Sequence, residues 1–137
     1  MTFFRWNRET DETYEYANFE KDSEDELVRR LGEMERIRRT PGGFEKERRV
    51  AKTQVGPYEV STVFLGIDHN FLGRFGGEPI LFETMIFARH RTFDYQQRYH
   101  TGKEAQAGHD QLVGRLRWLL KTPQVSRKRI DQIMRQL

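Results

Sequence analysis

The strongest constraint on the fold is a pair of β-type runs, Tyr58 to Leu65 and Pro79 to Phe87, on either side of a polar excursion. Both runs are rich in β-branched and aromatic residues, which favour strands. The excursion collects charged side chains and glycines, a composition typical of a loop that carries function. The pattern predicts a two-stranded scaffold that presents such a loop.

The length allows one domain. A chain of 137 residues with 36% hydrophobic residues can bury a single modest core, to which its ten Phe contribute. We predict an α+β fold in which a small antiparallel β-sheet follows an N-terminal helix and precedes long C-terminal helices. The single domain over 1–137 divides into an aromatic and acidic arm (1–22), a sheet (44–100) and C-terminal helices (101–137).

Capping and apolar periodicity place three helices. Ser23 fits a cap for a helix that ends near Arg39, before a turn of proline and paired glycines. Thr101 opens the strongest helix, and Ser126 can cap a last one. The last helix carries an apolar stripe opposite its basic residues, and we predict that the C-terminal helices mediate homo-oligomerisation. The stripe consists of Ile130, Ile133, Met134 and Leu137.

Strand signals outside the central pair are weaker. Residues 44–55 favour a strand, and residues 97–100 favour a short edge strand after a polar connection over 88–96. The arm over 1–22 shows no clean period and predicts at most one short strand. Trp6 and its neighbours are expected to dock on the body or on a second subunit.

Charge is distributed unevenly although the formal net charge is only +3. Residues 1–28 hold nine acids and three bases, a net of −6, whereas residues 110–137 hold seven bases and two acids, a net of +5. Such ends can attract each other or a partner, or can be two solvated faces. No cysteine, secretory signal or membrane-length apolar run occurs, so we expect a cytoplasmic protein with no membrane partner.

The sequence offers weak signals for catalysis. Asp68 and His69 with Glu83, His100 and His109 could form a metal site, but no HExxH, HxH or CxxC spacing is present. A structural role, in which Asp68 caps the turn, is favoured. GxSxG, GxGxxG and the P-loop pattern are also missing. We therefore expect no enzyme activity, no catalytic metal and no cofactor.

Anion recognition remains the best chemical interpretation of the central region. Guanidinium groups and aromatic rings together suit a phosphate and a base, although the same mixture also occurs on ordinary surfaces. The arginines are Arg74, Arg89, Arg91 and Arg98, interleaved with Phe75, Phe82, Phe93, Tyr95 and Tyr99. The basic residues from Arg127 to Arg135 raise nucleic acid as a separate partner.

Three blocks resemble a widespread family of small phage proteins: STVFLGIDHNF at 61–71, FETMIF at 82–87 and YHTGKEAQAGHDQLV at 99–113. The likeness covers roughly residues 50–117, and the blocks are specific in order and spacing. Residues 72–77 and the basic tripeptide 89–91 depart from the pattern.

The architecture also resembles the phage anti-Thoeris sponges of the first type. That resemblance implies an oligomer that sequesters glycocyclic ADP-ribose or cyclic oligonucleotides without cleaving them, with a pocket near a subunit interface. The motif positions that it assigns to ligand binding are Asp68, Phe82, Glu83, Arg98, Tyr99 and Thr101. Arg74 joins this set through its charge.

The leading hypothesis from the sequence is a phage accessory protein of host-cell cytoplasm that captures a phosphate-containing nucleotide signal. Slow release without turnover suits such a role. Two alternatives remain: a virion or assembly component, and a nucleic-acid-binding protein that uses its basic terminal helix.

Overall fold

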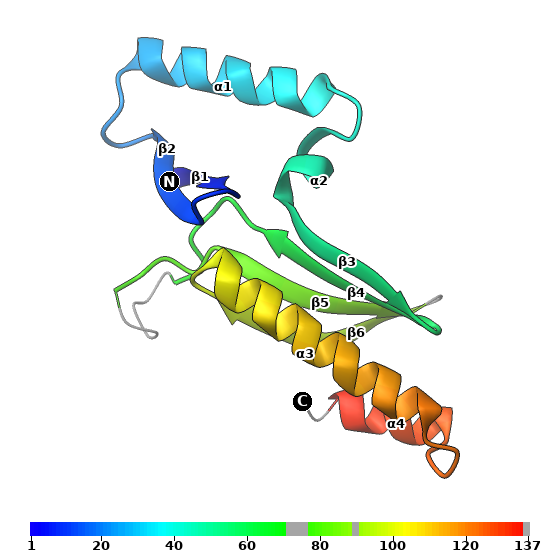
Figure 1. The fold of residues 1–137 in the computed structure, drawn as a ribbon. Coiled ribbons are helices and arrows are strands. Elements are labelled where there is room, and N and C mark those ends of the chain that lie inside the picture. The colour runs from blue at the N-terminus through cyan, green and yellow to red at the C-terminus, as the bar shows by residue number, and fades with distance from the viewer. Residues whose placement is uncertain (71–76, 89–90, 136–137) are drawn as a thin grey trace.

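The computed structural model describes residues 1–70, 77–88 and 91–135, except for the side chains of 91–94 and 135. It has an α+β fold with two antiparallel sheets and helices at both ends of the chain (Figure 1). No helix in these ranges is long and apolar enough to span a bilayer. In chain order the elements are β1 (Thr2–Asn7), β2 (Glu12–Asn18), α1 (Glu24–Arg39), α2 (Gly43–Arg48), β3 (Arg49–Val55), β4 (Tyr58–Phe64), β5 (Phe82–Ala88), β6 (Arg91–Tyr99), α3 (Gly102–Lys121) and α4 (Arg127–Arg135).

The main sheet has the strand order β3-β4-β5-β6 and is antiparallel throughout. The predicted central pair is confirmed, because β4 pairs with β5 in a register that sets Phe64 opposite Phe82. Side chains alternate between the two faces of a strand. Helix α3 lies across the face that carries Val60, Thr62 and Phe64, so this face forms the core (Figure 1).

The core consists of two neighbouring clusters on that face. One joins the sheet to α3 and α4, and the other joins the sheet to the N-terminal hairpin and the start of α3. Two residues of the predicted α4 stripe are buried within their own chain, Ile130 at 1% and Met134 at 0% exposure, whereas Ile133 is partly buried and Leu137 lies outside the described residues. Oligomerisation through the C-terminal helices stays a prediction. The buried side chains of Ile130 and Met134 are not accessible to a second copy.

Helix positions agree with the capping signals. Ser23 caps α1 through a bond of 3.3 Å from the Glu26 amide, and Thr101 caps α3 through a bond of 3.1 Å from the Glu104 amide. Ser126 accepts the Arg129 amide at 3.2 Å at the start of α4. Each bond satisfies a donor that the first helical turn leaves without a partner.

Three secondary-structure predictions were wrong. Residues 43–48, which were predicted to belong to a strand, form the helix α2 before β3 begins. The segment contains good helix formers, and Arg8 binds the carbonyl groups at its C-terminal end. The Arg8 guanidinium donates to the carbonyls of Lys46 and Glu47, both at 3.1 Å. The arm is a full hairpin, β1–β2, and β6 is nine residues long rather than a short strand at its end. An edge strand such as β6 tolerates the polar residues that obscured its period.

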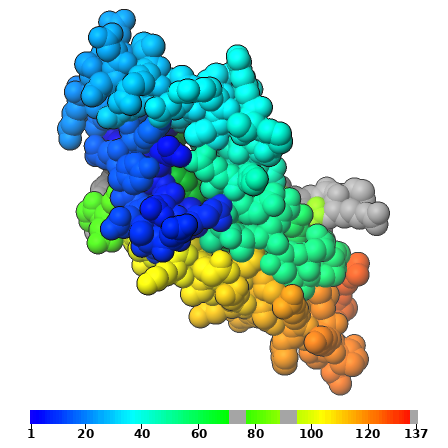
Figure 2. All heavy atoms as spheres, turned by 45° about the horizontal axis from the view of Figure 1, so that its top comes forward, coloured from blue at the N-terminus to red at the C-terminus, as the bar shows by residue number. Residues whose placement is uncertain are grey.

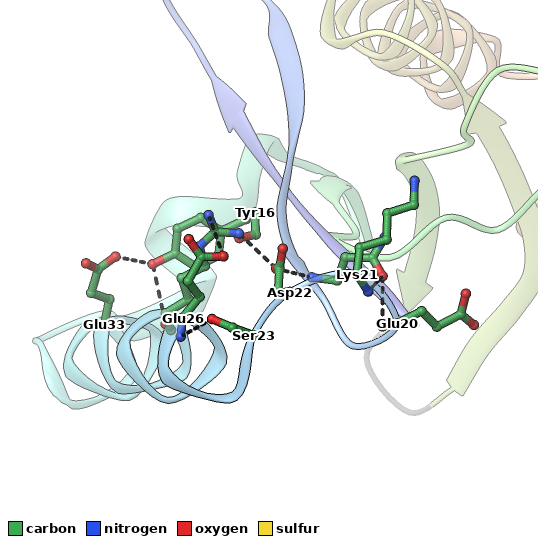
Figure 3. A network of polar contacts seen from close by, with 9 residues as sticks. Tyr16, Glu20, Lys21, Asp22, Ser23, Glu26 and Glu33 are labelled. Atoms are coloured by element: carbon green, nitrogen blue, oxygen red, sulfur yellow. Dashed lines mark hydrogen bonds and ion pairs between the residues drawn. The ribbon is translucent and has the colours of Figure 1, made fainter.

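Helix α1 is attached by polar contacts, because none of its residues is buried. Arg30 donates to the Tyr16 carbonyl at 2.6 Å and pairs with Asp22 at 2.9 Å, and the Tyr16 hydroxyl bonds Glu33 (Figure 3). These contacts hold α1 against β2. The apolar stripe of α1 remains partly exposed.

The hairpin lies against the start of α3 (Figure 2), and one carboxylate joins the two. Asp11, which adopts the left-handed region with φ of 60°, accepts the amides of Gly102 at 2.8 Å and Lys103 at 3.0 Å. Its Oδ1 also accepts the Trp6 indole at 2.9 Å. A negative group at a helix N-terminus is favourable. Trp6 itself packs against Phe64 and Phe82, which confirms its expected docking on the body.

A buried polar network fastens α3 to the sheet. His109, 2% exposed, hydrogen-bonds with Thr62 through Nδ1 and with Thr53 through Nε2, each at 2.8 Å. Thr62 in turn bonds Thr84 at 2.6 Å. Burial lowers the pKa of His109, an effect that Asp110 partly offsets. The network therefore holds a neutral imidazole whose two nitrogens both have partners.

Two glycines of α3 give an internal comparison. A Cβ at Gly108 would lie 2.2 Å from the Tyr99 hydroxyl, whereas a Cβ at Gly114 would meet no atom within 4 Å. We expect Gly108→Ala to lower the free energy of unfolding by about 1–3 kcal/mol through overpacking. Gly114→Ala should raise it by about 0.5–1 kcal/mol, because alanine favours helix. Urea denaturation of both variants checks the pair, and equal effects would contradict the packing described.

His109 should make stability fall in mild acid. Its folded-state pKa lies below that of the unfolded chain, so below about pH 6.5 the unfolded state binds the additional proton and is favoured. The free energy of unfolding is therefore expected to decrease as the pH falls from 7.5 to 5. In His109→Gln this part of the slope should disappear while the other three histidines remain. Urea midpoints across this pH range measure it, and parallel curves would refute the assignment.

Candidate ligand-binding groove

The first predicted site residue, Asp68, lies after β4 and hydrogen-bonds to residues on both sides of the loop that leads to β5. Its Oδ1 accepts the amides of Asn70 and Ile80, both at 2.8 Å. The Asn70 side chain donates to the Glu78 carbonyl at 2.8 Å, and His69 donates its amide to Ile80. Asp68 thus takes the turn-capping role that the sequence favoured, and a ligand contact for it stays a prediction.

The four predicted residues of β5 and β6 pair across the sheet on opposite faces. Phe82 lies opposite Tyr99 on the core face, and Glu83 lies opposite Arg98 on the other. Phe82 is fully buried beside Trp6, with ring centroids 5.2 Å apart, so its ring offers no surface to a ligand. Arg98 is already paired with the buried Glu83 at 3.0 Å.

The remaining predicted residues separate further. Thr101 serves as the cap of α3, and Arg74 lies outside the described residues, as do Phe75 and Arg89. The side chains of Arg91 and Phe93 are outside them too. Among the described residues, no three His, Cys, Asp or Glu side chains come close enough to hold a metal ion. The described members of the predicted set therefore do not form one site, and among them Tyr99 borders a cavity.

That cavity is a groove of about 380 Å³ between the free edge of the sheet and one flank of α3. Strand β6 contributes Tyr95, Gln97 and Tyr99, which point to the same side because they alternate by two. Helix α3 contributes residues at a spacing that keeps them on one flank, namely Gly108, Gln111, Leu112 and Arg115.

Two tyrosines form the aromatic wall of the groove. Tyr99 is 9% exposed, and its hydroxyl approaches α3 closely because Gly108 lacks a side chain. Burial raises the pKa of Tyr99, partly offset by a polar contact with Thr84. Burial likewise raises the pKa of Tyr95. The neighbouring Tyr99 raises this pKa further, and the positive charge of Arg115 lowers it. Both phenols thus remain neutral donors and acceptors well above physiological pH.

Arg115 supplies the charge of the groove. Within the described ranges it has no carboxylate partner, and every ion pair there joins residues between positions 5 and 98. Its guanidinium is exposed and near enough to Tyr95 to affect the titration of that ring. A cation of this kind can meet a phosphate without first breaking an ion pair.

Two glutamines complete the polar lining. Gln97 and Gln111 face the groove from opposite walls, and each amide can donate and accept hydrogen bonds. No carboxylate or histidine is among the described side chains that line this groove. The arrangement can bind a flat, heteroatom-edged ring that carries a negative group.

A second cavity lies beneath α1 and is a poorer candidate. It is lined by aromatic rings that include Phe4, Trp6 and Phe44, but its volume is only about 40 Å³, room for a few water molecules. Its Arg5 is bound to Glu47 at 2.9 Å. Without movement of α1 it cannot admit a nucleotide.

Sequence reasoning missed Gln97, Gln111 and Arg115. Arg115 and Gln111 are four residues apart at the border of the apolar stripe of α3, a position that reads as solvated surface. Tyr95, Gln97 and Tyr99 carry the two-residue period of one strand face, which was the available signal for β6. Only the tertiary structure shows that β6 and this flank of α3 lie side by side.

The chain matches no family model, no curated protein and no solved structure. Its resemblance to phage proteins and anti-Thoeris sponges therefore stays a prediction.

The tyrosine wall can be tested by titration. Because the folded-state pKa of Tyr95 is raised, its contribution to stability is present below about pH 10 and is lost as the pH rises further. Burial also raises the pKa values of Tyr99 and Tyr16, so the ultraviolet absorbance of tyrosinate should include a late step whose amplitude Tyr95→Phe reduces. Tyr14→Phe, which deletes an exposed tyrosine, controls for the loss of one chromophore. An unchanged late step in Tyr95→Phe would place that ring in solvent.

Proposed function

We propose that this protein binds a phosphate-bearing nucleotide in the groove between β6 and α3 and releases it unchanged. The observation that carries the proposal is the meeting of Tyr95, Tyr99 and the unpaired Arg115 around one cavity. A base stacks on an aromatic face, and a guanidinium binds phosphate with two parallel hydrogen bonds.

The size and polarity of the groove support this ligand class. About 380 Å³ lies within the range of small-molecule sites, and most of the wall is polar or aromatic rather than aliphatic. Gln97 and Gln111 suit the mixed donors and acceptors on the edge of a base. Of the lining residues only Leu112 has an aliphatic side chain, so a purely apolar ligand fits poorly.

Sequestration of a signal is the biological role that we propose for such binding. The sequence resemblance supplies the first ligands to assay, namely glycocyclic ADP-ribose and cyclic oligonucleotides. A binder that holds its ligand needs slow dissociation and no turnover. The lack of a carboxylate or imidazole in the described lining agrees with that role.

Calorimetry with glycocyclic ADP-ribose and cyclic oligonucleotides tests the proposal, using Arg115→Gln and its control Arg117→Gln. Both arginines are exposed on α3, but two residues of helix turn the control away from the groove. Arg115→Gln should weaken binding roughly tenfold to a hundredfold, the worth of hydrogen bonds to a charged group. Arg117→Gln should leave it nearly unchanged.

Recovery of the ligand provides the second readout. Mass spectrometry after incubation should return the added molecule intact, and its presence should raise the midpoint of thermal unfolding. Absence of heat and of thermal protection with every nucleotide would overturn the proposal. Equal losses in the two arginine variants would move the site out of the groove.

A further inference from the structure

Beyond the groove, α3 carries an exposed tryptophan. Trp118 is 65% exposed, the largest exposed aromatic ring in the described chain. It lies three residues after Arg115 and seven after Gln111, spacings that place all three side chains on the same flank of the helix. A large flat ring thus extends the line of the groove beyond its end.

Cations without acidic partners surround this end of the molecule. They lie on α3 and on the first turn of α4, which meet at one end of the fold (Figure 1). All are exposed, and within the described ranges none is in an ion pair. They are Arg115, Arg117, Lys121, Arg127, Lys128 and Arg129.

The remainder of the described surface is different. Its ion pairs join residues of the N-terminal half and the sheet, as in Arg38 with Glu35 at 2.6 Å. Acids outnumber bases over residues 1–28, whereas bases outnumber acids over residues 110–137. The positive potential is therefore concentrated where Trp118 is exposed, and a polyanion would be drawn to this end.

We propose that the same site also binds a single-stranded nucleic acid, which passes through the groove and along α3 over Trp118. This inference rests on the proposed nucleotide site and names a longer ligand for it. One base stacks on Tyr95 in the groove, another stacks on Trp118, and the backbone follows Arg115 and Lys121. Stacking on successive aromatic side chains along a basic track is how single strands are bound without sequence preference.

The geometry favours a single strand over a duplex. The groove and Trp118 both offer ring faces, which only unpaired bases can reach. From Gly108 to Lys121 the helix runs about 20 Å, the length of roughly six stacked nucleotides. A mononucleotide would use the groove and leave Trp118 and the far cations without a role.

Fluorescence anisotropy with labelled oligo-dT of two, six and twelve nucleotides tests the inference. Affinity should rise from two to six nucleotides and change little beyond. Trp118→Ala should weaken the binding of the six-nucleotide strand by about tenfold, the loss of one stacked base. It should leave the binding of a mononucleotide nearly unchanged.

Matched variants separate the track from general effects. Tyr14→Ala removes another exposed aromatic ring, 49% exposed on β2, and should have no effect on strand binding. Lys121→Gln should lower the slope of log affinity against log salt by about 0.7, the value for one phosphate contact on a single strand. Lys103→Gln, at the opposite end of α3, should leave the slope unchanged.

The outcomes distinguish this inference from the proposed function. Nucleotide binding with no dependence on length or on Trp118 would overturn the strand and leave the nucleotide site standing. Equal or tighter binding of a twelve-base-pair duplex would replace it with a duplex-binding surface. Quenching of Trp118 by anionic lipid vesicles without oligo-dT binding would replace it with a membrane surface. If neither nucleotide nor strand binds, both proposals fail.

Discussion

The fold depends on a buried chain of hydrogen bonds that crosses the sheet beneath α3. His109 joins Thr53 of β3 to Thr62 of β4, and Thr62 joins Thr84 of β5. Every member has a partner, so the network fixes one register and one helix position where an apolar core alone would tolerate sliding. The sequence blocks 61–71, 82–87 and 99–113 each contribute one member, namely Thr62, Thr84 and His109. These three blocks therefore contribute directly to the packing of α3 on the sheet.

Small residues let other groups approach α3 on both sides of this network. At Gly102 the helix meets Asp11 and Trp6, and at Gly108 it meets the Tyr99 hydroxyl. The first contact joins the acidic hairpin to the N-terminal end of α3, whereas basic residues lie at the C-terminal end of the helix. The uneven charge of the chain is therefore distributed along α3. The second brings an aromatic ring to the border between core and surface. Tyr99 thereby belongs to the core and to the groove at once.

The groove arises where an edge strand and a helix flank diverge. Both walls belong to regular elements: β6 is paired with β5, and α3 packs against the core. A site on such elements needs little ordering when a ligand binds, which favours affinity. Its distinguishing chemistry is the contrast between Arg98, which Glu83 neutralises, and Arg115, which has no acidic partner among the described residues. Sequence composition treats these two arginines alike.

The sequence by itself determined the local features whose signals lie within a few residues: the caps Ser23, Thr101 and Ser126, the apolar stripes of three helices, the β4–β5 pair and the turn role of Asp68. Tertiary structure alone decided which side chains meet. Phe82 is part of the core because Trp6, far away in sequence, covers it, and α4 packs Ile130 and Met134 into the core. Arg115 reached the tyrosines of β6 only through the placement of α3, because spatial neighbours from distant segments leave no periodic trace in a single sequence.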